Sequence, residues 1–203
     1  MALEVEVKFL VQDLAGVRER LLTAGAVLKK ARVFERNVRY DTEDEALLGR
    51  WELLRLRQDT AVKLTFKGPP PQAIQSEAKV REELEVEVSD FDTAAAIVQR
   101  LGFVPKQIYE KYRETFQLGA VEVVLDEMPY GDFVELEGPE ADLKPLTAVL
   151  QLDWSKRILG NYLLLMAQLK AFHNLPFNDL AFTHFAEKDF AIADLPLYDF
   201  GDI

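Results

Sequence analysis

Two pairs of glutamates have the spacing of metal ligands presented by β-strands. Glu4 and Glu6 lie near the N-terminus, and Glu135 and Glu137 lie much later in the chain. Side chains at positions i and i+2 of a strand point to the same face, roughly 7 Å apart. Carboxylates on neighbouring strands can therefore converge on one hard cation. Mg²⁺ and Mn²⁺ prefer a few carboxylates together with water and phosphate oxygens, so the sequence predicts Mg²⁺ or Mn²⁺ as cofactor.

Basic residues alternate with apolar residues in the same way in other segments. The candidates are Lys8, Arg39, Arg55, Arg57, Lys63, Lys67, Arg81, Lys111 and Arg113. So many cations cannot all be satisfied by one another, and planar guanidinium groups bind phosphate oxygens with two hydrogen bonds. Acidic and basic groups together predict a metal-bridged polyphosphate site.

These residues belong to eight segments that alternate apolar and charged residues with a period of two, which is typical of half-buried strands. The expected strands cover residues 3–9, 37–41, 54–57, 62–67, 83–88, 111–116, 121–126 and 133–137. Helices are expected at residues 14–24, 91–101, 144–150 and 155–172, the first with Asp13 as its N-cap. The predicted fold class is α+β.

The alternation gives each strand one apolar face and one face that is almost entirely ionic. For a single strand, an ionic face is usually the solvated side of an open sheet, and that alternative stays open. Across all eight strands an open sheet is less favoured, because a solvated face normally also carries Ser, Asn and Gln. The helices expected at 14–24, 91–101 and 155–172 are available to cover the apolar face. The sequence therefore favours a closed eight-stranded antiparallel β-barrel, a tunnel with an ionic interior and helices packed outside.

Composition narrows the function classes further. The 203 residues carry a formal net charge of -11, which disfavours binding to a nucleic acid duplex. Cysteine is absent, and both histidines, His173 and His184, lie near the C-terminus, so oxygen ligands are the expected metal ligands. No basic segment followed by an apolar stretch begins the chain, and residues 158–169 are too short to span a bilayer. We therefore expect a cytoplasmic protein with no membrane partner.

The ordered series of these segments resembles the CYTH superfamily, the triphosphate tunnel metalloenzymes. This superfamily includes class IV adenylyl cyclases, thiamine-triphosphatases, inorganic triphosphatases and fungal-type RNA triphosphatases. The N-terminal segment Glu4-Val5-Glu6-Val7-Lys8 is similar to the family's Glu-x-Glu-x-Lys signature. It is followed in order by Arg39-Tyr40-Asp41, Leu54-Arg55-Leu56-Arg57, Lys63-Leu64-Thr65-Phe66-Lys67-Gly68, Arg81-Glu82-Glu83-Leu84-Glu85, Lys111-Tyr112-Arg113, Leu125-Asp126 and Phe133-Val134-Glu135-Leu136-Glu137. The resemblance covers roughly residues 2–170 and implies an eight-stranded antiparallel tunnel.

The resemblance also implies roles for individual residues. The implied metal ligands are Glu4, Glu6, Glu135 and Glu137, with Asp126 as a further candidate. The implied triphosphate-binding residues are Lys8, Arg55, Arg57, Lys63, Lys67, Lys111 and Arg113. Arg39 and Arg81 are expected as tunnel-wall contacts, or alternatively as partners of neighbouring carboxylates. Glu83 and Glu85, with Lys8, are the catalytic candidates, and the two glutamates would take a second metal or orient the attacking water.

The expected function is metal-dependent hydrolysis of a small triphosphate, namely inorganic tripolyphosphate, thiamine triphosphate or a nucleoside triphosphate. The first alternative is a class IV adenylyl cyclase that converts ATP to cyclic AMP and pyrophosphate. The second alternative is a non-catalytic polyphosphate-binding module. The paired carboxylates argue against this module, because a pure anion receptor gains little from acids beside its ligand.

The C-terminal part of the chain differs from the preceding part in composition. Residues 1–172 are expected to form the tunnel domain, and residues 173–203 an extension packed on the same domain. The extension is rich in Phe and interrupted by Pro176 and Pro196. Alternatively, it contributes to a homodimer interface.

Overall fold

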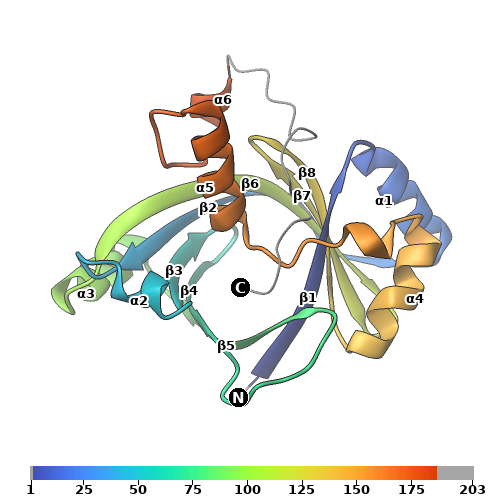
Figure 1. Ribbon diagram of the computed structural model, residues 1–203, viewed down its shortest axis with the longest axis horizontal. Coiled ribbons are helices and arrows are strands. Elements are labelled where there is room, and N and C mark those ends of the chain that lie inside the picture. The colour runs from blue at the N-terminus through green and yellow to red at the C-terminus, as the bar shows by residue number, and fades with distance from the viewer. Residues whose placement is uncertain (1, 187–203) are drawn as a thin grey trace.

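The computed structural model describes residues 2–186, in which eight antiparallel strands close into a ring (Figure 1). The order around the ring is β1-β5-β4-β3-β2-β6-β7-β8, and β1 closes it by pairing with both β5 and β8. The strands are β1 (Ala2–Val11), β2 (Val27–Asp41), β3 (Leu53–Gln58), β4 (Val62–Gly68), β5 (Lys79–Val88), β6 (Val104–Leu118), β7 (Val121–Met128) and β8 (Gly131–Glu137). The α+β class and the eight antiparallel strands agree with the prediction.

Three strands begin at least four residues earlier than predicted, and one of them is β6, which begins at Val104 rather than at residue 111. β2 begins at Val27 rather than at residue 37, and β5 begins at Lys79 rather than at residue 83. The first part of β2 pairs with β6 alone, because its pairing with β3 starts only at Arg36. Most of residues 27–34 are exposed, so this stretch lacks the alternation by which strands are predicted.

Three helices cover the outside of the ring (Figure 1). They are α1 (Leu14–Thr23), α3 (Phe91–Arg100) and α4 (Glu140–Leu150). Asp13 accepts a hydrogen bond from the Gly16 amide at 2.8 Å, as its predicted N-cap role requires, and Asp90 accepts one from the Thr93 amide at 2.7 Å. Each cap satisfies one amide that has no partner within the helix.

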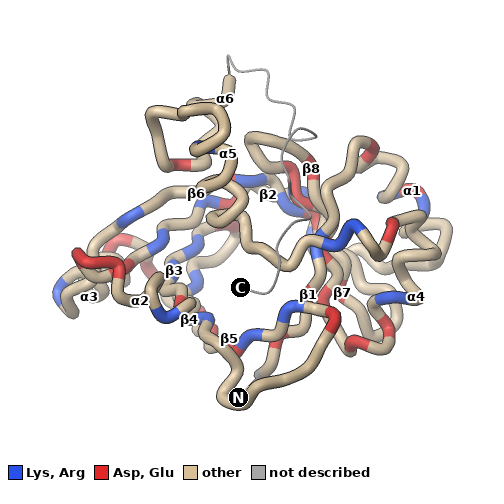
Figure 2. The backbone as a smooth tube through the Cα atoms, in the orientation of Figure 1, with Lys and Arg blue, Asp and Glu red and all other residues tan. Residues whose placement is uncertain are grey.

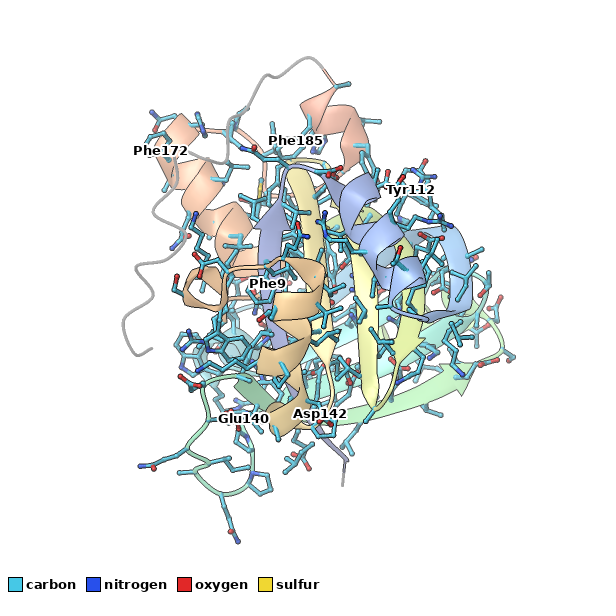
Figure 3. The ribbon with its side chains drawn as sticks, turned by 90° about the vertical axis from the view of Figure 1, so that its right-hand side faces the viewer. Phe9, Tyr112, Glu140, Asp142, Phe172 and Phe185 are labelled. Atoms are coloured by element: carbon cyan, nitrogen blue, oxygen red, sulfur yellow. The ribbon has the colours of Figure 1, made fainter. Side chains whose placement is uncertain are left out.

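The outward side chains of the strands form two hydrophobic clusters with these helices. One cluster joins β1, β7 and β8 to α1 and α4, which pack against each other (Figure 3). It includes Val7, Phe9, Val17, Leu21, Val123, Leu125, Leu136, Leu143, Leu146 and Leu150. The other cluster joins Val38, Tyr40 and Leu56 to Ala94, Ala95 and Val98 of α3. Because the apolar faces point outward against helices, the ionic faces point into the ring.

The last long helix begins later than predicted. Instead of a helix over residues 155–172, the chain forms a short 3₁₀ turn at Trp154–Lys156 and then α5 (Tyr162–His173). Between them, Ile158 pairs with Lys8, with backbone hydrogen bonds of 2.7 and 3.2 Å. Asn161 then caps α5 by accepting from the Leu164 amide at 2.8 Å. The bridge to β1 and this cap fix the start of α5.

The position of α5 also corrects the prediction that it covers the outer, apolar face. Tyr162, Leu165, Met166 and Leu169 pack in a third cluster with Tyr109 of β6 and Phe133 of β8, among others. Tyr109 lies an even number of residues before Lys111 and Arg113 on β6, and Phe133 lies an even number before Glu135 and Glu137 on β8. Residues at such spacings share one face of a strand, so Tyr109 and Phe133 also point into the ring. Helix α5 therefore packs on inward-facing aromatic residues, where the ionic pattern is interrupted.

The chain after α5 returns to the strands. Leu180 pairs with Tyr109 of β6, the amides of Leu180 and Glu110 form backbone hydrogen bonds of 2.9 Å, and α6 (Phe182–Phe185) follows. Of the predicted extension, residues 173–203, the structure describes the part up to residue 186. The domain boundary at residue 172 stays a prediction. Within residues 2–186, none of the helices has the length and hydropathy needed to cross a membrane.

Candidate functional site

The ring of strands surrounds a cavity of about 650 Å³. Charged residues occur along the strands around it (Figure 2). Twelve basic and nine acidic residues line the cavity, so its wall carries a positive surplus although the whole chain carries a formal charge of -11. An acidic protein with a locally basic cavity attracts anions to that cavity specifically.

One wall of the cavity holds a group of three carboxylates. Glu4 of β1, Glu83 of β5 and Glu137 of β8 each offer an oxygen within 4.8 Å of the other two. Burial and then the charge of Glu4 raise the pKa of Glu137 to about 8, and burial and then the charge of Glu6 raise the pKa of Glu4. The buried Oε2 atom of Glu4 also has no hydrogen-bond partner. Three close, mutually repelling oxygen donors with an unpaired buried atom fit a hard divalent cation.

Two lysines lie beside this carboxylate cluster. Lys67 forms ion pairs with Glu4 and, at 3.4 Å, with Glu83. Lys79 pairs with Glu6 at 2.6 Å, and Lys8 lies 3.8 Å from the same carboxylate. Burial alone would raise the pKa of Glu6, but the charges of Lys79 and Lys8 outweigh it and hold that pKa below its usual range. Glu6 is therefore engaged with lysines rather than placed in the cluster of three.

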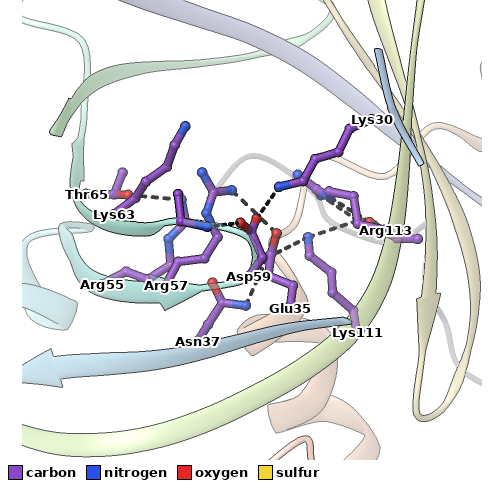
Figure 4. A network of polar contacts seen from close by, with 12 residues as sticks. Lys30, Glu35, Asn37, Arg55, Arg57, Asp59, Lys63, Thr65, Lys111 and Arg113 are labelled. Atoms are coloured by element: carbon purple, nitrogen blue, oxygen red, sulfur yellow. Dashed lines mark hydrogen bonds and ion pairs between the residues drawn. The ribbon is translucent and has the colours of Figure 1, made fainter. Parts of the chain in front are cut away.

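A second wall is built around Glu35 of β2 (Figure 4). Its side chain is 1% exposed and lies 3.6 Å from Lys111 Nζ and 3.5 Å from the Arg57 guanidinium. Asn37 Nδ2 donates to Glu35 Oε1 at 2.9 Å, whereas the buried Oε2 atom accepts no hydrogen bond. Burial favours the neutral acid, but Lys111 and then Arg113 outweigh it and lower the pKa of Glu35. An ionised glutamate thus stands among the cations predicted to bind phosphate.

Glu85 of β5 holds Arg57 and two further members of that cation wall, Lys63 and Arg55. Its oxygens accept from Lys63 at 2.6 Å and from Arg57 at 3.0 Å, and Arg55 lies at 3.7 Å. Although burial raises it, the pKa of Glu85 is lowered overall, chiefly by the hydrogen bond from Lys63 and the charge of Arg57. Glu85 is therefore ionised, holds the neighbouring cations in place and is a weak base.

The third wall is a chain of ion pairs across β1, β8, β6 and β7. Lys8 pairs with Glu135 at 2.9 Å, and Arg113 joins Glu135 to Asp126 with contacts of 2.6 Å to each. Asp126 also accepts from Lys111 at 3.0 Å and from the Tyr162 hydroxyl at 2.9 Å. Asp126 is fully buried, and its two oxygens are occupied by these donors.

The remaining predicted site residues lie at the rim of the cavity. Arg39 lines it but bonds Asp41 at 2.9 Å and Glu45 at 2.7 Å, which matches its alternative role as a carboxylate partner. Arg81 lines it but donates to the backbone carbonyls of Trp51, Gly68 and Lys67. The cavity is lined by all the predicted catalytic, substrate-binding and metal-ligand residues other than Asp126. The three-carboxylate cluster unites Glu4 and Glu137 with Glu83, and includes neither Glu6 nor Glu135.

Four residues of the site were not predicted: Lys79 and Tyr162 line the cavity, and Glu35 and Asn37 are buried beside its cations. Glu35 and Asn37 continue the inward parity of Arg39 and Asp41, and Lys79 continues that of Arg81. Extending the two strands toward the N-terminus would have found all three. Tyr162 comes from a helix, so the strand pattern carried no signal for it.

The rim also has an apolar part. Leu48 of the short helix α2 (Ala46–Gly49) and Trp51, which follows it, line the cavity while remaining 48% and 52% exposed. Trp51 has a φ of 61°, in the left-handed region that non-glycine residues rarely adopt. Leu163 and Leu164 of α5 line the same cavity. An organic group attached to a phosphate chain would find apolar contacts here.

The chain matches a known protein family over most of its length. A CYTH domain matches residues 2–158. The chain belongs to the CYTH family. A candidate adenylate cyclase of Methanocaldococcus jannaschii is 30% identical over 151 residues, which are 73% of this chain and 84% of that protein.

Solved structures show the same CYTH fold. The Pyrococcus horikoshii protein PH1819 is 26% identical with a TM-score of 0.70, covering 82% of this chain and 99% of its own. A candidate adenylyl cyclase of Hippeastrum is 15% identical with a TM-score of 0.55, covering 79% and 91% respectively. The CYTH match ends at residue 158, before α5, so Tyr162 lies beyond the matched segment.

Proposed function

We propose that this protein is a metal-dependent enzyme that hydrolyses a small triphosphate within the ring of strands. The observation that carries the proposal is one cavity that holds both the cluster of Glu4, Glu83 and Glu137 and a wall of lysines and arginines. A polyanion alone would need only the cations. A divalent cation alone would need only the carboxylates. A triphosphate carried with a divalent cation needs both.

Glu4, Glu83 and Glu137 are the residues that would hold Mg²⁺ or Mn²⁺. When bound, such an ion supplies positive charge to phosphate oxygens as negative charge develops on them. The repulsion that raises the pKa of Glu137 supports this role, because a divalent cation relieves it.

The lysines and arginines bind and orient the phosphate chain. Lys8, Lys111 and Arg113 present their charges from one wall, and Arg55, Arg57 and Lys63 present theirs from another. Each is already held by carboxylates of the fold, so its position is set before the substrate arrives. Fixed charges of this kind need little reorganisation during phosphoryl transfer.

Glu83 and Glu85 take different parts in this proposal. Glu83 lies in the carboxylate cluster, where it binds the cation. Glu85 keeps Arg57 and Lys63 in place, and its lowered pKa makes it a poor proton acceptor. The attacking water is then oriented by the cluster side of the cavity.

An adenylyl cyclase is the second candidate, and the apolar rim favours it. Trp51, Leu48 and Leu164 offer contacts for an adenine ring, and the similar proteins of Methanocaldococcus jannaschii and Hippeastrum are both named as candidate adenylate cyclases. The Hippeastrum structure, however, is described as revealing a dominant triphosphatase activity in a candidate cyclase. A protein with this fold that is named as a candidate cyclase is thus described as mainly a triphosphatase.

Incubation of the protein with Mg²⁺ or Mn²⁺ and each of three substrates separates the candidates. Orthophosphate released from tripolyphosphate or thiamine triphosphate supports the proposed hydrolase. Cyclic AMP and pyrophosphate formed from ATP support the cyclase instead. The control is Glu4→Gln, which removes a cluster charge while keeping the shape of the side chain.

The same experiment tests a third possibility, a binding module. Tripolyphosphate that raises the melting temperature of the protein, with no product under either metal, would refute both enzymes. No stabilisation and no product would refute the cavity as a triphosphate site altogether.

A further inference from the structure

Helix α5 inserts one side chain among the charged groups of the cavity. Tyr162 is its first residue and is 6% exposed. The preceding residues are fixed, since Ile158 pairs with the backbone of Lys8 and Asn161 caps the helix. The ring of Tyr162 also packs edge-on against Phe133, with 5.1 Å between centroids. These contacts fix the position of the ring.

Tyr162 contacts three members of the ion-pair chain that forms the third wall. Its hydroxyl donates to Asp126 Oδ2 at 2.9 Å. Its ring lies under two ammonium groups, with Lys8 Nζ 4.9 Å and Lys111 Nζ 5.2 Å from the centroid. Lys8 and Lys111 belong to β1 and β6, which are separated in the ring by β8 and β7. Tyr162 thus links two lysines that no strand pairing brings together.

The chemistry of the ring suits this position. The face of an aromatic ring attracts a cation most strongly where water is excluded, and both lysines are almost fully buried, at 3% and 2% exposure. Burial raises the pKa of Tyr162 well above its usual range, and the charge of Asp126 adds to this effect. The hydroxyl therefore stays protonated and remains a donor to Asp126. Carboxylates hold both ammonium groups by charge, and the rigid tyrosine ring adds a contact that Lys8 and Lys111 share.

We propose that Tyr162 is a positioning residue that fixes the ammonium groups of Lys8 and Lys111 for the phosphate chain. The effect of Tyr162 on catalysis rests on the proposed function, whereas its contacts with Lys8, Lys111 and Asp126 do not. It makes α5, which lies beyond the CYTH-matched segment, a working part of the site. Helix α5 therefore has a role in the cavity in addition to its hydrophobic packing.

Two substitutions separate the contributions of the hydroxyl and the ring. Tyr162→Phe removes only the donor to Asp126, and Tyr162→Leu also removes the aromatic face. The matched control is Tyr40→Phe, which makes the same chemical change at a buried tyrosine of the outer cluster. We expect kcat/KM for tripolyphosphate to fall about tenfold in Tyr162→Phe, as for the loss of a hydrogen bond to a charged group, and further in Tyr162→Leu. The Tyr40→Phe variant should keep the wild-type value.

A second measurement needs no turnover and so tests the proposal separately from the proposed function. Acylation of lysines in the ligand-free protein, followed by mass spectrometry, reports how accessible and mobile each ammonium group is. In Tyr162→Leu we expect Lys8 and Lys111 to react several-fold faster, whereas Lys67 and Lys79 on the carboxylate side of the cavity keep their wild-type rates. A general loosening of the fold would raise all four rates equally and would count against the proposal.

The outcomes are distinct. A wild-type protein that turns over no triphosphate refutes the proposed function, while selective acceleration at Lys8 and Lys111 still supports the role of Tyr162. Unchanged acylation in Tyr162→Leu overturns that role even if the protein is an active triphosphatase. Should Tyr162→Leu fail to fold, Tyr162→Phe decides alone: wild-type kcat/KM together with wild-type acylation of Lys111 overturns the proposal.

Discussion

The carboxylate cluster predicts that the metal-free protein loses stability as the pH rises. The pKa of Glu137 is raised from 4.5 to about 8 in the fold. Between these two values the folded protein keeps a proton that the unfolded chain has lost. The free energy of unfolding therefore falls as the pH rises through this range. This is opposite to a salt-bridged carboxylate, whose contribution is lost as the pH falls.

The size of the effect follows from the shift. At 1.36 kcal/mol for each pKa unit, a shift from 4.5 to 8 corresponds to roughly 5 kcal/mol as an upper limit. Glu137 is only partly buried, so solvent screening reduces its repulsion with Glu4 and Glu6, and we expect about 2 kcal/mol. The raised pKa of Glu4 acts in the same direction, so the cluster titrates as a unit.

Urea unfolding in the presence of EDTA, at pH values from 5.5 to 8.5, measures this dependence. Glu137→Gln should flatten the profile, because the amide carries no charge at any pH in the range. Glu19→Gln, a change at an exposed position of α1, should keep the wild-type slope. Mn²⁺ at ten times its Kd should restore about 1.4 kcal/mol at pH 8, and less at pH 6, where protons compete for the same oxygens. A flat wild-type profile, or an equal slope in Glu137→Gln, would refute the reasoning.

Three further substitutions test other parts of the cavity. Glu83→Gln should lower kcat by about a hundredfold and Arg81→Gln by less than tenfold, because Arg81 is engaged with backbone carbonyls; equal losses in steady-state assays would contradict this ranking. Glu35→Gln removes a buried negative charge from the phosphate-facing cations, so calorimetry should show tripolyphosphate bound about tenfold more tightly, whereas weaker binding would assign Glu35 to holding Lys111 in place. Leu165→Ala, in the cluster under α5, should lower the free energy of unfolding by about 3 kcal/mol in urea, and a loss below 1 kcal/mol would contradict close packing there.

The parity of the strands was readable from the sequence because period-two alternation depends only on local geometry. Lys8, Arg55, Arg57 and Lys63 all face the cavity, as their alternation with apolar residues indicates. Asp13 was identifiable as a cap for the same reason, since its partner is only three residues away. Such features need no knowledge of how distant segments meet.

The sequence could not show which carboxylates of the cavity lie next to one another. Spacing shows which face a carboxylate occupies, but the strand order decides its neighbours. Pairing of β1 with β5 brings Glu83 opposite Ala2, next to Glu4, and pairing of β1 with β8 sets Glu6 opposite Glu137. Neither pairing joins segments that are adjacent in sequence.

The same limit explains the misplaced helix. The apolar residues of 158–169 indicate burial, but not the surface against which they are buried. That surface includes Tyr109 and Phe133, two aromatic residues on otherwise ionic faces. Each of these aromatic residues interrupts the ionic pattern of its own strand, and only the closed ring brings the two together.

The carboxylates of the cavity fall into two classes that differ only in their surroundings. Glu35, Glu85 and Glu135 stand among cations, which outweigh burial and lower the pKa of each. Glu4 and Glu137 belong to the three-carboxylate cluster, and burial and then the charges of neighbouring carboxylates raise the pKa of each. A fold under selection for stability alone would give each buried carboxylate a cation, as it does for the first class. In the second class Lys67 contacts Glu4 without outweighing burial and repulsion, and a divalent cation carried with a polyanion is the further positive charge that this cavity can accept.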